Sequence, residues 1–245
     1  MTDATQHPQR TAKLELKSEY PPMVKRRAVA DAQGNRAPRQ KRAQDSLARM
    51  LSATETLLAT RGVEGFTLVE VSRVGRVSIG SIYFRFESKE ALIRAVHERV
   101  MTRMEEDHIN LVARARQRAD GAKPRRRIVV LIEEMADFLR KYADIMHPLM
   151  LSARGDLQVQ ARGAESYNHL IAHLSEEIQS LGEVLIRPEG ETAVRTVIDI
   201  AYAAFARQLG LGLPDRPDLG PRWQDVRACM AEMAAAYLLT PAHSD

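Results

Sequence analysis

Apolar side chains recur every three to four residues over most of the chain, which is the spacing of one face of an α-helix. The first stripe begins just after Asp45, and further stripes of the same period occupy residues 128–139, 167–181, 194–209 and 223–237. A break between helices is expected at residues 146–148, which include Pro148. Alternating apolar and polar runs bounded by turn residues, the mark of a strand, do not compete with this pattern. The pattern therefore predicts an all-α protein.

The sharpest local signal is a helix start at residue 67. Thr67 precedes Glu70 by three residues, the spacing of a capping box, and Phe66 and Val71 have the spacing of a hydrophobic staple. These residues predict a short helix over 68–74.

A second short helix is expected after a turn at residues 75–77. Ser78 is a suitable N-cap, and this helix should end near residue 86, before Ser88 caps a long helix. Apolar residues of both short helices and the turn are expected to pack together: Leu68, Val71, Val74, Val77 and Ile82. Two short helices so joined are typical of a helix-turn-helix, although a generic helical hairpin has the same outline. Small residues at positions 78, 80 and 81 would let the second helix approach base edges in the major groove.

The N-terminal residues 1–42 carry no sustained apolar period, so they are expected to form a disordered basic arm. Residues 1–44 hold ten Lys or Arg against four Asp or Glu, a net charge of +6, whereas the whole chain carries +4. Such an arm suits DNA phosphates or anionic lipid, and a solvated tail is the plainer interpretation. It supports an alternative function: a protein that binds nonspecific DNA or an anionic surface through its arm, with a helical scaffold behind it.

Several function classes find no support in the sequence. No Gly-rich phosphate loop, nucleophile elbow or cysteine pair is present, so neither an enzyme nor a cofactor is expected. His169 and His173 are four residues apart but have no third ligand nearby in the sequence, so no metal site is expected. No apolar run approaches the roughly 18 residues of a membrane span, and the N-terminus lacks the apolar segment of a secretion signal. The expected location is the cytoplasm.

Residues 43–97 resemble the DNA-binding domain of the TetR family of transcriptional regulators. The resemblance rests on a first helix that ends in Arg61-Gly62, on Phe66-Thr67 and on the Val77-Ser78 turn. It is most specific in the string Gly80-Ser81-Ile82-Tyr83-Phe84-Arg85-Phe86, which is followed by Ser88-Lys89-Glu90-Ala91-Leu92.

The resemblance implies a three-helix DNA-binding domain at 43–97 and a helical ligand-binding and dimerisation domain at 98–245. It also implies a homodimer that binds a palindromic operator in double-stranded DNA, acting as a repressor that a small-molecule ligand releases. Carried over by position, four residues would face the bases: Ser78, Ile79, Gly80 and Ser81. Four more would hold phosphates or pack beside them: Thr67, Tyr83, Phe84 and Lys89.

The turn departs from the family pattern at residue 76. The family usually has glycine immediately before the Val-Ser pair, where this chain has Arg76, with Gly75 one residue earlier. If that position needs a positive φ, Arg76 carries a strain of order 1 kcal/mol. Otherwise the turn is shifted by one residue.

The C-terminal half is rich in methionine, aromatic residues and alanine. The resemblance implies a ligand pocket, with Phe138, Tyr142, Met146, Met150, Tyr167, Tyr202 and Phe205 as candidates, although a packed core is the simpler explanation of any one of them. Small residues on the last two helices would let helices approach closely. A dimer interface is expected at Ala201, Ala204, Ala228, Ala231 and Ala235, and the alternative is a helix pair buried inside one subunit.

Overall fold

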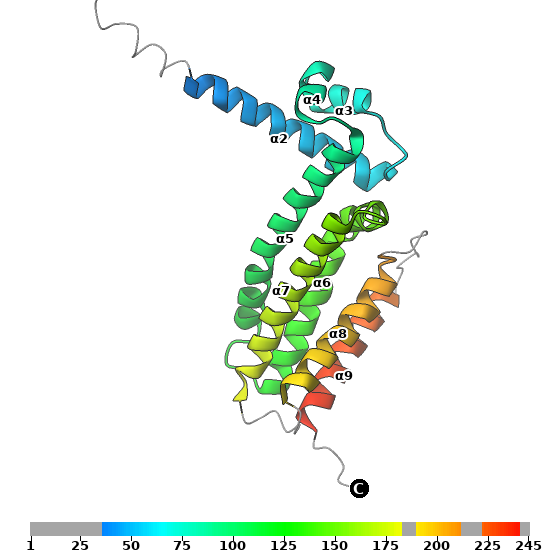
Figure 1. The fold of residues 1–245 in the computed structure, drawn as a ribbon. Helices are drawn as coiled ribbons and strands as arrows, with labels where there is room; N and C mark the ends of the chain where they lie inside the picture. The colour runs from blue at the N-terminus through cyan, green and yellow to red at the C-terminus, as the bar shows by residue number, and fades with distance from the viewer. Residues whose placement is uncertain (1–35, 183–189, 212–221, 241–245) are drawn as a thin grey trace, which may run out of the picture. The chain divides into compact units, whose positions relative to one another are not determined.

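The computed structural model describes residues 36–182, 190–211 and 222–240. The chain divides into two units, residues 1–43 and residues 44–245. Every regular element in the described ranges is a helix (Figure 1), which confirms the predicted all-α class. The helices are α2 (Arg36–Arg61), α3 (Leu68–Gly75), α4 (Ile79–Arg85), α5 (Lys89–Arg118), α6 (Pro124–Ser152), α7 (Leu157–Gln179), α8 (Gly190–Gln208) and α9 (Arg222–Leu239).

Side-chain caps set three helix starts where the sequence predicts them. Thr67, Ser78 and Ser88 each accept a hydrogen bond from a backbone N–H in the first turn of α3, α4 and α5. Pro124 begins α6, where its missing N–H would have no partner within the helix. The two short helices and the long helix after them are therefore determined by local sequence.

Two expected boundaries are corrected by the structure. α2 begins at Arg36, not after residue 42, because good helix formers fill this segment and Pro38 lies in the first turn, where a proline is tolerated. α6 continues through the break expected at residues 146–148 and contains Pro148. Pro148 is buried there, so packing offsets the roughly 3 kcal/mol cost of a proline inside a helix. The rest of the expected arm, residues 1–35, lies outside the described residues.

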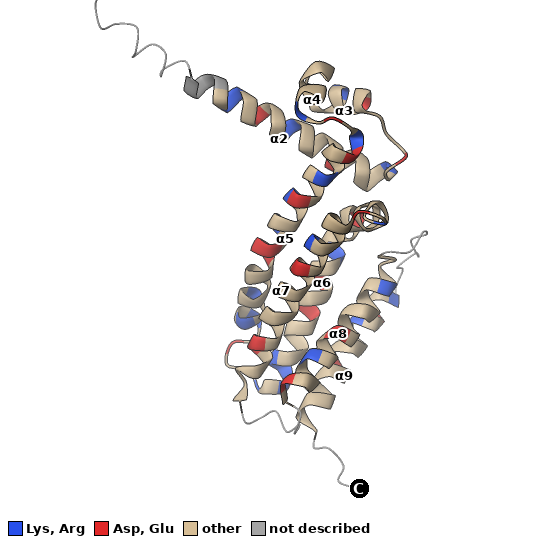
Figure 2. Ribbon diagram, viewed as in Figure 1, with Lys and Arg blue, Asp and Glu red and all other residues tan. Residues whose placement is uncertain are grey.

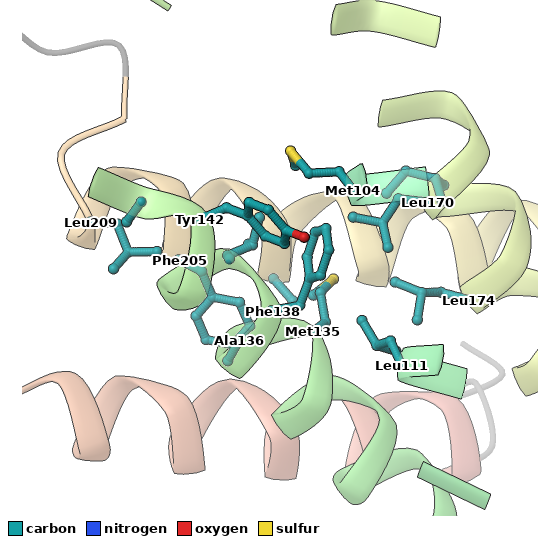
Figure 3. Close-up of a cluster of buried hydrophobic side chains, with 14 of the residues drawn as sticks. Met104, Leu111, Met135, Ala136, Phe138, Tyr142, Leu170, Leu174, Phe205 and Leu209 are labelled. Atoms are coloured by element: carbon teal, nitrogen blue, oxygen red, sulfur yellow. The ribbon is translucent and has the colours of Figure 1, made fainter. Parts of the chain in front are cut away.

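Helices α5 to α9 form the C-terminal bundle. α6 packs against α5, α8 and α9, while α7 packs against α5 and α8. Figure 3 shows part of the buried core, in which Phe138 and Tyr142 of α6 lie beside each other among apolar side chains of neighbouring helices. Each such side chain contributes about 1.5–3 kcal/mol when it is fully buried. None of the described helices is both long and apolar enough to cross a lipid bilayer.

Ion pairs connect α5 to the helices on either side of it. Figure 2 shows acidic and basic positions interleaved along α5 and α7. Arg103 of α5 lies 2.6 Å from Glu55 of α2, and Arg162 of α7 lies 2.6 Å from Glu105 of α5. α5 is therefore linked through charged side chains both to α2 and to α7.

Candidate nucleic-acid interface

The capping box at the start of α3 is fully formed. The backbone N–H of Glu70 donates to Thr67 Oγ1 at 3.3 Å, and the backbone N–H of Thr67 donates to Glu70 Oε2 at 2.9 Å. That backbone N–H and the Arg61 guanidinium hold the pKa of Glu70 below its usual value. Thr67 is exposed, with its hydroxyl engaged in the cap. Its predicted phosphate contact stays a prediction.

The two short helices pack through fewer residues than expected. Val71 of α3 and Ile82 of α4 are fully buried, and Phe66 is buried at the staple position. Leu68 and Val77 pack against them and are partly buried. Val74 is 45% exposed, so its predicted place in the core was wrong. The inner face of α3 runs through residues 68, 71 and 75, and residue 74 is turned about 100° away from residue 75.

The close contact between α3 and α2 explains the unusual turn. A Cβ atom at Gly75 would lie 3.1 Å from the carbonyl oxygen of Arg49 and 3.3 Å from Cβ of Ala53, both in α2. Glycine is therefore needed at residue 75 for close approach, and the left-handed cap falls on Arg76, at φ 50° and ψ 48°. Arg76 is the one non-glycine residue with positive φ in the described ranges. Of the two expectations, strain at Arg76 is the one that the structure confirms.

Arg76→Gly is expected to raise the free energy of unfolding by about 1 kcal/mol, because it removes the left-handed strain. Urea denaturation followed by circular dichroism measures the change. The matched control is Arg73→Gly, the same substitution at an exposed position inside α3, which should lower stability by about 1 kcal/mol. A destabilised Arg76→Gly variant would contradict the assignment of strain to this residue.

Helix α4 presents most of its surface to solvent. Ile82 is the one buried residue of this seven-residue helix, while Ser78, Ile79, Gly80 and the Tyr83–Phe84 pair are exposed. Phe84 is 88% exposed, which is unusual for a phenylalanine and marks an interaction surface.

The start of α4 is small and polar. Ser81 donates its backbone N–H to Ser78 Oγ at 3.1 Å, and the two hydroxyls lie 2.7 Å apart. A Cβ atom at Gly80 would meet nothing within 4 Å, so the surface around this residue is open. The predicted base-facing residues thus share one accessible end of the helix, which can enter a groove.

Lys89 has a partner within the protein. Its ammonium donates to the carbonyl oxygen of Phe66 at 2.7 Å and lies 4.3 Å from the centroid of the Phe66 ring. These contacts hold the start of α5 against the loop before α3. The phosphate contact of Lys89 stays a prediction. Such a contact would have to use the N–H groups of the ammonium that Phe66 does not engage.

The predicted ligand-pocket residues fall into separate groups. Phe138 and Tyr142 have ring centroids 5.2 Å apart in the buried core, and the Tyr142 hydroxyl donates to Asp107 at 2.6 Å. Burial, followed by the Asp107 contact, raises the pKa of Tyr142 to about 12. Tyr167 and Tyr202 form a second pair with centroids 4.8 Å apart. Of the remaining candidates, Phe205 is buried against Trp223, Met146 is partly buried and Met150 is exposed. The role of these residues as a ligand pocket stays a prediction.

The alanine-rich face assigned to a dimer interface is largely internal. Ala201, Ala231 and Ala235 are buried inside the subunit, and Ala201 lies at the base of a groove between α8 and α9. Ala228 is exposed and Ala204 is partly buried. The three buried alanines therefore match the alternative reading, a helix pair packed within one subunit, because their small side chains let α8 and α9 lie close to the rest of the bundle.

The outward side of α8 and α9 carries larger apolar residues that the sequence did not single out as an interface. Ile200, Met233 and Tyr237 are exposed, and Met233 is 56% exposed. They line a groove of about 240 Å³ between the two helices. We call these three residues the α8/α9 apolar face.

The histidines of α7 lie in different surroundings. His169 is exposed, with Nδ1 3.4 Å from Glu105, whereas His173 lies beside His108 of α5, a residue that the sequence did not single out. In the described ranges, no group of three or more His, Cys, Asp or Glu is placed to hold a metal ion.

Comparisons with known proteins agree with this geometry. Residues 50–96 match the family model described as bacterial regulatory proteins, tetR family. A candidate TetR-family transcriptional regulator from Mesorhizobium loti MAFF303099 is similar over 80% of this chain and 96% of its own, with a TM-score of 0.62 and 12% identity. A transcriptional regulator (TerR/AcrR family) from Aquifex aeolicus VF5 is similar over 77% of this chain and 99% of its own, with a TM-score of 0.53 and 17% identity.

One similar structure holds a small molecule. The transcriptional regulator FadR from Bacillus subtilis, solved in complex with stearoyl-CoA, is similar over 80% of this chain and 99% of its own, with a TM-score of 0.50 and 14% identity. At these identities the likeness shows the fold. A search of curated proteins found no match to the sequence.

Proposed function

We propose that this chain, whose residues 50–96 are a DNA-binding domain of the TetR family, is a homodimeric repressor that binds a palindromic operator and is released by a small molecule. The observation that carries the proposal is the exposure of α4. One buried residue, Ile82, anchors the helix, while its small N-terminal residues and the Tyr83–Phe84 pair remain open. Such a surface suits insertion into the major groove.

The roles of the α4 residues follow from their chemistry. Ser78 and Ser81 can exchange their mutual hydrogen bond for contacts to base edges, because a hydroxyl both donates and accepts. The open backbone at Gly80 lets the helix lie close to the base pairs. Tyr83 can donate its hydroxyl to a phosphate, which positions the helix without reading sequence.

The α8/α9 apolar face supports the homodimer. An exposed cluster of Ile200, Met233 and Tyr237 is costly in water, and a two-fold contact between copies of the same face would bury it twice. To read a palindrome, the two copies of α4 in this dimer must lie about one DNA turn apart, roughly 34 Å.

The connection through α5 supports release by a ligand. This helix begins at Lys89, which is bonded to Phe66 beside α3, and runs without a break to Arg118 inside the bundle. The Arg103–Glu55 salt bridge joins it to α2 as well. A molecule that displaced α5 within the bundle would therefore move α4. The separation of the two copies of α4 would then no longer match the fixed spacing of the half-sites on the duplex. FadR with stearoyl-CoA provides a similar fold that holds a small molecule.

Tyr83→Ala is expected to weaken DNA binding about 5- to 30-fold, the effect of losing one phosphate hydrogen bond and the adjoining ring contact. Genomic footprinting of the purified protein identifies the operator, and gel-shift titration on that operator measures the affinity. Leu157→Ala, which truncates another exposed apolar residue well separated in sequence from α4, is the matched control and should bind normally. Equal affinities for wild type and Tyr83→Ala would remove this residue from the interface.

A further inference from the structure

Buried polar atoms without partners are concentrated on α5 and α7. His108 of α5 is 1% exposed, yet neither of its ring nitrogens has a hydrogen-bond partner. Nδ1 of His173 and the hydroxyl of Ser166, both on α7, are also buried without a partner. Four of the five such atoms in the described part of the chain belong to these three residues. Because an unpaired buried polar group is unfavourable, the two neighbouring histidines point to a binding role.

The two imidazoles lie across the α5–α7 contact, and we call them the histidine pair. Their ring centroids are 6.2 Å apart, and the His108 ring packs edge-on against Phe138 at 5.0 Å. One oxygen atom about 2.8 Å from a nitrogen of each ring is compatible with that separation. The pair can therefore hold a single polar group between its rings.

A groove reaches His173 from the surface. His173 lines a groove of about 290 Å³ between α5 and α7, and its apolar walls are formed by Ile109, Val112 and Ala113. On the inner side, His108 adjoins Phe138 in the apolar core of the bundle. Arg116, Glu176 and Glu177 also line the groove, and Arg116 is paired with Glu177 at 2.6 Å. The histidine pair thus lies between this partly apolar groove and the apolar core, which suits a molecule with one polar group on an apolar body.

The charges around the histidine pair favour a neutral polar group. Burial lowers the pKa of His108 to about 4, so near pH 7 its ring is neutral and offers one N–H donor and one lone pair. The neighbouring carboxylates of α5 already have cationic partners: Glu105 is paired with Arg162, and Asp107 with Lys141. Arg116 of the groove is likewise paired with Glu177, so a ligand carboxylate between the rings would find these cations already engaged, and its burial would be costly. An ammonium there would lose its hydration, while neutral His108 offers it a single lone pair. A hydroxyl, by contrast, can accept from one ring and donate to the other.

We propose that the histidine pair binds the hydroxyl group of an apolar small molecule that enters the bundle between α5 and α7. This inference rests on the proposed function, since it assigns the chemical class of the releasing ligand. Occupation of the site would separate α5 from α7 and so act on the helix that reaches the DNA-binding domain.

Titration of the full-length protein with 1-octanol tests the assignment, with 2-octanone, octanoate and octylamine as probes of equal chain length. 1-Octanol is expected to shift the ring NMR resonances of both histidines, assigned with His108→Phe and His173→Phe, and to raise Tm by a few degrees. The ketone, which can only accept, and the two charged probes should bind at least about 10-fold more weakly.

His108→Phe is expected to weaken 1-octanol binding at least about 10-fold. His169→Phe, which replaces the exposed histidine of the same helix as His173, should leave it unchanged. If His108→Phe does not fold, the wild-type ring resonances decide the question. The proposal is overturned if 1-octanol leaves those resonances in place, if octanoate binds as tightly, or if no probe binds. A gel shift with the ligand-free protein tests the proposed function separately, because DNA binding by that form does not require the histidine pair to bind a hydroxyl group.

Discussion

Met233→Glu is expected to give a folded monomer whose affinity for the operator is lower by a factor of about 10² to 10⁴. Met233 is 56% exposed in the subunit, so a glutamate there remains hydrated and the fold should persist. In the proposed dimer the same glutamate would be buried against its symmetry copy, and two unpaired charges would oppose association. The loss of affinity follows because each half-site must then be bound independently.

Analytical ultracentrifugation at micromolar concentration, paired with gel-shift titration, measures both effects. The matched control is Leu157→Glu, which places the same charge at a residue that is 80% exposed and lies outside the α8/α9 apolar face. This control should remain dimeric and bind normally. A wild-type protein that is monomeric at this concentration, or a Met233→Glu dimer with normal affinity, would refute the interface.

Ala231→Arg is expected to unfold the protein, with a loss of more than about 4 kcal/mol in the free energy of unfolding. The side chain of Ala231 is completely buried on α9, a helix that packs against α6 and α8, so an arginine there would be both overpacked and unpaired. The alanine pattern alone assigns this residue to a dimer interface and predicts a folded monomer instead. Circular dichroism during urea denaturation distinguishes the two outcomes.

Ala228→Arg provides the matched control, one turn earlier on the same helix. Ala228 is exposed, so this variant should fold with wild-type stability to within about 0.5 kcal/mol. A natively folded Ala231→Arg protein would contradict the burial of Ala231 against the rest of the subunit.

The helices α3 and α4 and the start of α5 could be predicted closely because their determinants are local. Thr67, Ser78 and Ser88 each cap a helix through atoms within three residues, and a capping box is specific enough to be recognised by spacing. Val74 was misplaced because a helix of eight residues has too few apolar positions to fix its inner face. That face is decided by the approach of Gly75 to α2, which is a tertiary contact.

The last two helices show why the faces in the second half could not be predicted. Alanine is compatible equally with a core and with an interface, and the inner side of α9 consists mainly of alanines together with Trp223 and Leu238. Met233 and Tyr237 belong to the apolar stripe of the sequence, yet they are exposed. The positions of the larger apolar residues alone therefore do not identify which side of α9 is buried.

The histidine pair was only half visible in the sequence. His173 is noticeable for its spacing from His169, but its neighbour in the structure is His108, 65 positions earlier on another helix. The signal available was a histidine within an otherwise apolar stripe of α5, with Met104 and Leu111 at helical spacing on either side. Such a stripe predicts burial of the ring, but it cannot indicate which helix lies opposite.

The brevity of α3 and α4 has a consequence for the dynamics of the molecule. Helices of eight and seven residues are too short to be stable alone. Within these two helices, the buried residues are Val71, Gly75 and Ile82. Local opening of the pair thus requires far less free energy than opening the long helices α5 and α6, so its amides should exchange with solvent first. A DNA duplex that binds only when α3 and α4 are folded would stabilise these two helices against local opening. If α3 and α4 contact DNA as proposed, binding of the duplex would therefore also stabilise the two short helices that read it.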